Sequence, residues 1–515
     1  MSATNSDHHV PPLSETLLGR RSPPTNDYAV LTSTHMTKAT TIPFSRMRKV
    51  ILFVCTLLAS IGGIYYSFRD TRPRMDSSAA SLLNSGFSSL QFDHHEFPIE
   101  GGRVSHLLLR QPNLCDPQVN QYSGYFTIDE NLDKKYFFWF FEKRRQSPDE
   151  AAPTTMWLTG GPGSSSMIAL LAENGPCKVN ADGSGTVRNE YSWTQKTNML
   201  WVDQPPGTGF STGKYDTSEV EIAEDMYHFL QAFFHKFPQY NKKFHITGES
   251  YGGHYVPVVT AKIITENKKL LDTPSTFLGS TSSNHPVYID IKGMAIGNGL
   301  TVPAEQVKWY SKMAYNSGSA PSIVNYTTYK EMEAAADKTV ELIKECYQDP
   351  DATDANSPLP SACLEMNYVF NAKVLNVALA TGANEYDLRL NHPYNLSNLD
   401  RYLNRPDVRA ELGAIVKPWS ESNTKVWLAL APRDFLADYT SAVQTVLASG
   451  AKVLIYAGNG EDEVVKVPVG VYKGFKNFAF LRVFGAGHMA PMDKPLETLH
   501  MYDTFINGEL FNNEG

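Results

Sequence analysis

A serine set among glycines is the first place in this chain where residue types and spacing suggest chemistry. The segment Gly248-Glu249-Ser250-Tyr251-Gly252 fits the pattern G-x-S-x-G, with the apolar "FHI" before it and a helix-compatible stretch after it. This pattern is typical of a strand that turns sharply into a helix and exposes a nucleophilic serine at the turn. Ser250 is therefore the predicted nucleophile. The alternative is a tight turn whose serine only caps the following helix.

A serine hydroxyl attacks well only when a neighbouring base removes its proton. In proteins with this kind of turn, the base comes last in chain order, after the final strand of the sheet. The segment "FGAGHMAPMDKP" places His488 there, on a glycine-flanked loop. His254 lies closer in sequence, but on the helix leaving the turn it is better explained as a packing or hydrogen-bonding residue.

Attack on a carbonyl group produces an oxyanion that needs fixed hydrogen-bond donors. The backbone amide of Tyr251, directly after the serine, is one expected donor. The segment "WLTGGPGSSS" offers another, because Gly160 and Gly161 let backbone N–H groups approach a substrate closely. A phosphate-binding loop would need Gly-Lys-Ser/Thr after the glycines, and this chain lacks that continuation.

The elements that must position these residues alternate between short apolar runs and helical patterns. This alternation predicts an α/β fold with a mostly parallel sheet covered on both faces. We expect a helix at 219–237 and strands at 136–142, 154–161, 198–205, 243–250, 291–299, 425–432, 451–458 and 478–487. The pattern lapses over 301–422, which we interpret as a lid inserted into a catalytic domain formed by 97–300 and 423–512.

These motifs together resemble the serine carboxypeptidases of the vacuolar carboxypeptidase Y and cathepsin A type. The resemblance extends from about Phe97 to Leu510, through "QYSGYF", "WLTGGPGSSS", "YSWTQKTNMLWVDQPPGTGFS", "FHITGESYGGHYVP", "IGNGL" and "AGHMAPMDKP". It implies an α/β-hydrolase fold with an insertion domain, and removal of C-terminal residues from peptides, generally at acidic pH. By the same motifs, Ser250 is the nucleophile, His488 the base, and the amides of Gly161 and Tyr251 the oxyanion donors. No cofactor and no metal ion is expected.

The resemblance also implies a site for the substrate's terminal carboxylate, made by Thr159, Gly160, Glu173 and Glu249. Like charges at close range raise one another's pKa, so we expect the two glutamates to share a proton at acidic pH and donate hydrogen bonds to the substrate. Thr159 stands where the family usually has an asparagine, and a hydroxyl donates once where an amide donates twice. Ser164 replaces a frequent cysteine of the family.

The third member of the predicted catalytic triad is the open question. The family has a Gly-Asp-x-Asp pattern after the next-to-last strand, whereas this chain reads "IYAGNGEDEVVKVPVG". In ungapped register, Asn459 takes the first Asp position and Glu461 the catalytic one. The stretch leading to His488 is about thirty residues shorter than usual, so Asp462 is the alternative. Loss of the acid typically costs about four orders of magnitude in rate.

The N-terminal part carries one long apolar run, 50–68, which contains no charged residue. Its length matches the hydrocarbon core of a bilayer, and its distance from the N-terminus favours an uncleaved membrane anchor over a signal peptide. The polar segment 1–45 is expected to be a disordered cytosolic tail, and the Ser-rich segment 69–96 a stalk. Basic residues flank both ends of the run, so the positive-inside rule does not orient it.

Other features favour a lumenal catalytic part in the secretory or endomembrane system, with the vacuole or lysosome as the expected destination. Asn325 and Asn395 begin glycosylation sequons. Four cysteines lie outside the apolar run, an even count that suits disulfides although free buried thiols would look the same: Cys115, Cys177, Cys346 and Cys363. The net charge of −8 and pI near 6.0 give no reason to expect nucleic acid as a partner.

The leading hypothesis is therefore a membrane-anchored serine-type carboxypeptidase whose partners are peptide and protein C-termini. The first alternative is a catalytically impaired homologue that binds peptides or stabilises a partner enzyme. The second is an acyltransferase on the same scaffold, with an alcohol replacing water in deacylation.

Overall fold

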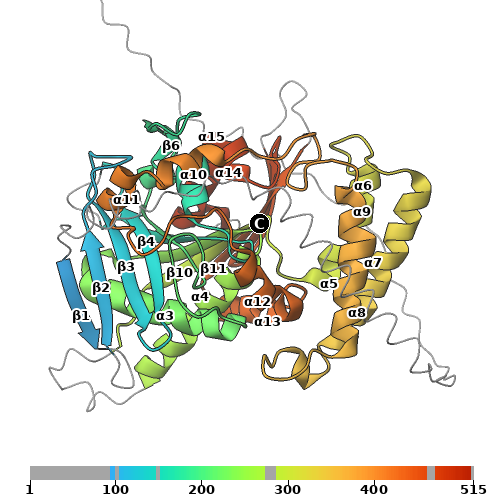
Figure 1. Cartoon of the computed structure of the whole chain (residues 1–515), viewed down its shortest axis with the longest axis horizontal. Helices are drawn as coiled ribbons and strands as arrows, with labels where there is room; N and C mark the ends of the chain where they lie inside the picture. The colour runs from blue at the N-terminus through green and yellow to red at the C-terminus, as the bar shows by residue number, and fades with distance from the viewer. Residues whose placement is uncertain (1–92, 99–103, 146–150, 273–285, 461–469, 512–515) are drawn as a thin grey trace, which may run out of the picture. The chain divides into compact units, whose positions relative to one another are not determined.

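The centre of the fold is a mixed, mostly parallel sheet. The computed structural model describes residues 93–98, 104–145, 151–272, 286–460 and 470–511 (Figure 1). Its 11-stranded sheet has the order β1-β2-β3-β4-β8-β5-β9-β10-β11-β13-β12, parallel from β8 to β13 and antiparallel at both edges. In this order the strands are β1 (Asp93–Pro98), β2 (Val104–Arg110), β3 (Gln121–Asp129), β4 (Lys134–Phe141), β8 (Asn198–Val202), β5 (Thr154–Thr159), β9 (Phe244–Glu249), β10 (Ile291–Gly297), β11 (Lys452–Asn459), β13 (Phe478–Phe484) and β12 (Gly470–Phe475). A separate pair joins β6 (Cys177–Val179) to β7 (Thr186–Arg188).

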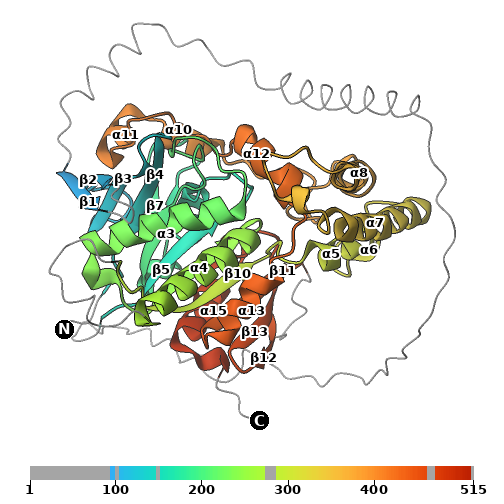
Figure 2. The same cartoon turned by 90° about the horizontal axis from the view of Figure 1, so that it is seen from below.

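Helices cover both faces of this sheet, as the unbroken apolar strands require. The longer ones are α3 (Glu219–Lys236), α4 (Gly252–Asp272), α7 (Tyr326–Cys346), α8 (Ser361–Val369), α12 (Thr424–Asp434), α13 (Thr440–Ala448) and α15 (Pro495–Asn507). Shorter ones are α5 (Pro303–Gln306), α6 (Tyr310–Asn316), α9 (Asn376–Leu379), α10 (Ser397–Leu403), α11 (Pro406–Leu412) and α14 (Ala490–Asp493). Figure 2 shows α3 and α4 lying across the sheet.

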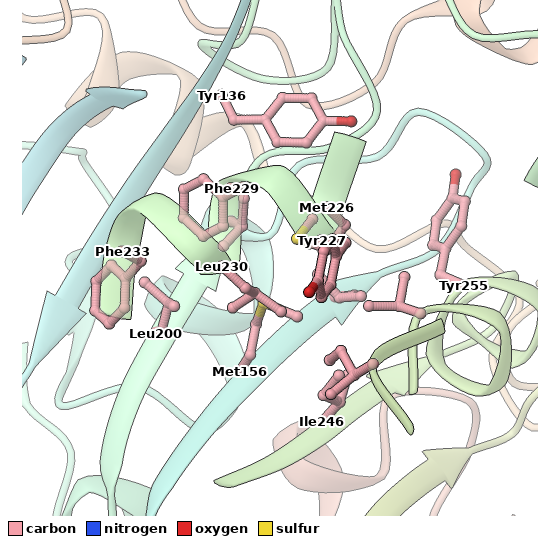
Figure 3. Packing of buried hydrophobic residues seen from close by; sticks show 14 of the residues in the cluster. Tyr136, Met156, Leu200, Met226, Tyr227, Phe229, Leu230, Phe233, Ile246 and Tyr255 are labelled. Atoms are coloured by element: carbon pink, nitrogen blue, oxygen red, sulfur yellow. The ribbon is translucent and has the colours of Figure 1, made fainter. Parts of the chain in front are cut away.

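Alternate residues of the central strands enter two separate cores. Met156 of β5 and Leu200 of β8 belong to the core under α3 and α4, and Figure 3 shows them near Leu230 of α3. Trp157 of β5 points to the other face, into the core that includes Tyr502 of α15. Packing on both faces therefore fixes the positions of the strand ends. A site built at those ends requires such fixed positions.

The expected insertion 301–422 divides into two parts. Its first part, α5 to α8 with the π-helical turn Phe370–Leu375, buries side chains in a small core of its own. Figures 1 and 2 both show α7 and α8 close together. Its second part, α10 and α11, instead packs into the sheet core, through Leu399, Leu403 and Leu412.

One expected strand is wrong. Residues 425–432 form part of helix α12, and β10 pairs directly with β11. An apolar run of eight residues fits a strand or a buried helix equally well. The helix prevails because Val426 and Leu430, four residues apart, are buried while Leu428 is exposed, and because the Asn423 side chain caps its first turn.

The N-terminal expectations lie mostly outside the described residues. These include the tail 1–45, the apolar run 50–68 and nearly all of the stalk 69–96. The described chain begins with β1 at Asp93, four residues before the expected start of the fold at Phe97. Within the described ranges, no helix is long and apolar enough to cross a membrane.

Candidate active site

Ser250 occupies a strained turn between β9 and α4. β9 ends at Glu249, α4 begins at Gly252, and Ser250 has a φ of 64°. This left-handed conformation is uncommon for a residue with a side chain and persists only where the surroundings enforce it. Here they do: the Ser250 N–H donates to the Gly297 carbonyl at 3.0 Å, and its carbonyl accepts from the N–H groups of Gly253 and Leu300, each at 2.9 Å. The expected strand-turn-helix geometry is present, with the serine at its tip.

Two backbone N–H groups in this turn and in the adjoining glycine loop have no acceptor in the described part of the chain. They belong to Gly161 and Tyr251, the expected oxyanion donors. The glycine loop and the serine turn touch, because a Cβ on Gly160 would lie 2.4 Å from the Tyr251 nitrogen. Gly161 has a φ of +116°, which a side chain would strain. Glycine at these two positions therefore lets the loop lie directly against the turn.

His488 lies on the loop after β13, at the same edge of the sheet. Asn298, which follows β10, donates its side-chain amide to the His488 carbonyl at 2.7 Å. Its neighbour Gly297 holds the Ser250 amide, so the end of β10 contacts both segments. Burial lowers the pKa of His488 to about 4, so its imidazole is neutral and able to accept a proton over most of the pH range. The described residues contain no side-chain hydrogen bond to Ser250 or to the His488 ring. Such bonds are often long in enzymes without substrate.

Both candidates for the triad acid lie outside the described residues. Glu461 and Asp462 both fall in 461–469, outside them. The preceding strand β11 ends at Asn459, whose carbonyl accepts from the Gly485 N–H at 2.7 Å. The segment that carries both candidates therefore begins beside the loop that carries His488.

A segment of the insertion contacts the loop of the base. The Tyr386 carbonyl accepts from the His488 N–H at 2.8 Å, and the two rings are 5.1 Å apart. Asp387 lies against Gly487, where a Cβ would be 2.8 Å from its carboxylate, and is paired with Arg389. No local signal in the sequence predicts this contact, because 301–422 shows no periodic pattern that would place these residues.

The two glutamates of the expected carboxylate site meet beside the serine. Glu249 immediately precedes Ser250, and Glu173 ends a π-helical turn, Ala169–Glu173. Their side chains are 2% and 1% exposed and close enough for one carboxyl to donate a hydrogen bond to the other. Burial raises the pKa of Glu173 to about 8, with a contribution from the charge of Asp493. Burial also raises the pKa of Glu249 well above its ordinary range, and the charges of Glu173 and Asp493 add to this.

This carboxyl pair has unused hydrogen-bonding capacity. Oε2 of Glu173 and Oε2 of Glu249 are buried and have no partner in the described structure. Thr159, at the end of β5, accepts a hydrogen bond from the Trp157 indole at 2.9 Å, which leaves its hydroxyl proton available. Asp493 accepts from the Gly487 N–H at 2.7 Å and so connects the pair to the loop of the base.

The side chain of Tyr251 is held by a polar network that the sequence did not reveal. Its hydroxyl donates to Asp434 at the end of α12, as does the hydroxyl of Tyr439. Nδ1 of His254 is 3.0 Å from the same carboxylate. His254 is thus a buried hydrogen-bonding residue, as expected.

The cysteines form two disulfides, Cys115–Cys177 and Cys346–Cys363. The first joins the segment before β3 to β6, and the second joins α7 to α8 within the insertion. The sequon asparagines Asn325 and Asn395 are both exposed. Disulfides persist in oxidising compartments, so both features agree with the expected lumenal setting.

A serine on a sharp turn after a parallel strand, with an oxyanion loop after the neighbouring strand, defines an α/β-hydrolase. The structure thus confirms the fold class predicted from the sequence.

Comparisons with known proteins identify the family. The profile described as "Serine carboxypeptidase" matches residues 112–468 and 461–508, and the two matches meet at the segment of Glu461 and Asp462. Carboxypeptidase Y from Komagataella phaffii is 33% identical over 430 residues, which cover 76% of each chain. Carboxypeptidase Y homolog A from Emericella nidulans is 32% identical over 77% of this chain and 74% of that protein. The chain belongs to the serine carboxypeptidase family, and this membership supports a peptidase activity on peptides with free C-termini.

A solved structure shares the fold. Kex1(delta)p, a prohormone-processing carboxypeptidase from Saccharomyces cerevisiae, is 22% identical and superposes with a TM-score of 0.61. The likeness covers 77% of this chain and 94% of that structure.

Proposed function

We propose that this protein is a serine-type carboxypeptidase that releases C-terminal residues from peptides through an acyl-enzyme on Ser250. The observation that carries this proposal is the buried Glu173–Glu249 pair, which ends directly beside the serine with two unpartnered oxygens. A protonated carboxyl pair can donate a hydrogen bond to a carboxylate, which an ordinary ionised pair would repel. Such a pair next to a nucleophile selects the last peptide bond of a chain.

In the proposed reaction, the Ser250 hydroxyl attacks the carbonyl of that last bond while His488 takes its proton. The amides of Gly161 and Tyr251 donate hydrogen bonds to the resulting oxyanion. His488 then gives the proton to the leaving nitrogen, the C–N bond breaks, and the C-terminal amino acid departs. Water attacks the acyl-enzyme with His488 again as base, which releases the shortened peptide and restores the serine.

The substrate's terminal carboxylate is proposed to bind Glu173 and Glu249, with the Thr159 hydroxyl and the Gly160 amide as further donors. The free proton of Thr159 and the unpartnered oxygens of the pair support this assignment. We assign the triad acid to Glu461 or Asp462, on the segment after β11. Their position between β11 and His488 in the chain supports the assignment.

One observation favours the second candidate, a catalytically impaired homologue that binds peptides. Among the described residues, the Tyr386 ring lies 5.1 Å from the His488 ring, and no carboxylate hydrogen-bonds to the imidazole. A triad acid holds the imidazole in one tautomer and stabilises its charged form. Without the acid, turnover falls steeply, while the peptide-binding site stays intact.

Labelling with a fluorophosphonate separates the two candidates. An active enzyme is labelled at Ser250, and the label is lost in Ser250→Ala and His488→Ala. His500→Ala, which changes an exposed histidine on α15, is the matched control and should be labelled as the parent chain is. Release of the terminal residue from a peptide, measured by mass spectrometry against the same peptide with an amidated C-terminus, then tests the reaction. No labelling, together with retained peptide binding, would establish the impaired homologue.

We further propose that residues 50–68 anchor the protein in a membrane of the secretory system, with the catalytic part in the lumen. The two disulfides and the two exposed sequon asparagines support this placement. Glycosidase treatment of the protein made in a eukaryotic cell should lower its apparent mass, and Asn325→Gln with Asn395→Gln should abolish the change. An unchanged mass in the parent chain would contradict a lumenal catalytic part.

A further inference from the structure

A cluster of buried polar side chains lies beneath the serine turn and takes no direct part in the proposed reaction. Glu219 begins α3, His254 lies in the first turn of α4, and Asp434 ends α12. The three residues are 2%, 0% and 6% exposed. Each presents a ligand atom, and the three atoms lie within 4.8 Å of one another.

The cluster contains an unusual number of buried polar atoms without a partner. Both carboxylate oxygens of Glu219, Nε2 of His254 and the hydroxyl oxygen of Tyr136 are in this state. The Tyr251 hydroxyl lies close to Glu219 but donates its proton to Asp434, and the Gly163 N–H approaches the Tyr255 hydroxyl. Figure 3 shows Tyr136 and Tyr255 at the edge of the core beside α3 and α4, and both tyrosines interact electrostatically with Glu219. Buried polar groups in native proteins are nearly always satisfied by protein, water or an ion. Something not contributed by these side chains therefore completes the cluster.

The charge around Glu219 indicates that this component is a cation and not only water. Asp434 and Asp216 both lie near enough to repel the Glu219 carboxylate. Among the described residues, the Lys134 ammonium group is held by Asp216 at 2.6 Å and by Asp225 at 2.7 Å, and the His254 imidazole pairs with Asp434 at 3.0 Å. Four buried carboxyl groups, those of Glu219, Asp434, Asp216 and Asp225, thus have one ammonium group and one imidazole as partners, and burying an unbalanced charge is costly. A neutral water molecule would satisfy hydrogen bonds but leave the charge.

The donor atoms indicate which cation. Calcium and magnesium take oxygen ligands, whereas an imidazole with carboxylates suits zinc and related transition metals. We propose that Glu219, His254 and Asp434 together bind a divalent transition-metal ion of the zinc class. Three protein ligands leave a fourth position for water, which the nearby tyrosine hydroxyls can bind. The ligand atoms draw together when the ion binds.

The position of the site suggests a structural role. The three ligands come from three helices, and one of them, His254, follows Ser250 by one turn of α4. Asp434 also accepts a hydrogen bond from the hydroxyl of Tyr251, whose backbone amide faces the proposed oxyanion site. An ion here would tie α3 and α12 to the start of α4 and stiffen the turn that carries the nucleophile. These residues would position the site and would not act on the substrate.

The test measures metal content and spectra of the full-length protein, so it does not depend on turnover. We expect elemental analysis to find one zinc-class ion per chain after desalting, and less after treatment with a strong chelator. Adding Zn²⁺ back should raise the midpoint of thermal unfolding, and Co²⁺ in place of Zn²⁺ should produce visible d–d absorption. Glu219→Gln keeps the side-chain volume and should weaken metal binding by about 10- to 100-fold.

The matched control is Glu221→Gln, two residues further along α3. Its side chain is exposed and accepts a hydrogen bond from the Thr217 N–H. It should bind the metal as the parent protein does. The proposal is overturned if the parent chain retains no metal and gives neither a Co²⁺ spectrum nor a Zn²⁺-dependent midpoint. It is also overturned if Glu219→Gln and Glu221→Gln bind Zn²⁺ equally well, because the ion would then lie elsewhere. Either result would leave the carboxypeptidase proposal untouched.

Discussion

In the proposed carboxylate site, the raised pKa of Glu173 predicts the direction in which peptide binding depends on pH. The pKa of Glu173 is raised to about 8, so this carboxyl holds its proton below that pH and loses it above, while the pKa of Glu249 is raised well above its ordinary range. Loss of the proton removes a donor and adds a negative charge opposite the substrate's carboxylate. Above the pKa, the protonated fraction falls tenfold per pH unit, so we expect Kd to rise about tenfold between pH 7 and pH 9.

The assay is equilibrium binding of a short peptide to the Ser250→Ala protein, measured from pH 5 to pH 9. Binding is preferable to turnover because it does not depend on the triad acid. The double variant Glu173→Gln with Glu249→Gln cannot titrate, so its Kd should stay flat over this range. The same peptide with an amidated C-terminus lacks the carboxylate. Its Kd for the protein with Glu173 and Glu249 intact should therefore rise little with pH.

The control variant is Glu190→Gln, an exposed glutamate in the same region of the chain, which should keep the full pH dependence. The reasoning is refuted if the double variant shows the same rise in Kd as the parent protein. It is equally refuted if the Kd of the parent for the free peptide is constant from pH 5 to pH 9.

Three other predictions concern single features of the fold. Because the pKa of Glu173 is raised on folding, its contribution to stability is complete below its unfolded value near 4.3 and is lost as the pH rises through about 8. In chemical unfolding, the free energy of unfolding should therefore be lower by a few kcal/mol at pH 8 than at pH 5, and Glu173→Gln should reduce that difference. The same change of unfolding free energy with pH in both proteins would disprove this. Gly160→Ala forces a methyl group against the Tyr251 nitrogen at 2.4 Å, so kcat should fall by about 10²- to 10³-fold, with a smaller change in KM; an unaltered kcat would argue against the oxyanion assignment. Replacing Cys346 and Cys363 with serine opens a disulfide with a sequence separation of 17, and should lower the free energy of unfolding by about 2 to 4 kcal/mol in denaturant titrations; an unshifted midpoint would contradict it.

The parts of the site that could be predicted from sequence are those with a local pattern. Ser250 and its glycines specify a turn by themselves, because few residues tolerate that backbone geometry. His488 follows from chain order and its glycine-flanked loop. The exposed and buried residues of α12 could not be assigned in the same way, since an apolar run of that length has no period that distinguishes a strand from a helix.

Contacts between residues that are far apart in the chain could not be predicted from the sequence. His254 and Asp434 are 180 residues apart, and nothing local marks Asp434 as a partner of the helix that follows the serine. Glu219 looks like an ordinary first-turn glutamate, whose negative charge suits a helix N-terminus, until the structure places it among carboxylates. Tyr386 and Asp387 lie in a stretch with no periodicity, so their contact with the loop of His488 required coordinates.

The contact between Tyr386 and His488 links the proposed lid to the proposed base. In this proposal, substrate selection and proton transfer therefore depend on the same backbone segment. Residues 301–422, which we interpret as a lid over the proposed site, also accept the His488 N–H at 2.8 Å through the backbone carbonyl of Tyr386. A displacement of that segment, by a bulky ligand or by an engineered change of preference, will carry the imidazole with it. Substitutions in this insertion that aim to change substrate selectivity should therefore leave residues 384–390 unchanged. Changes within 384–390 are expected to lower the turnover rate even where they improve selectivity.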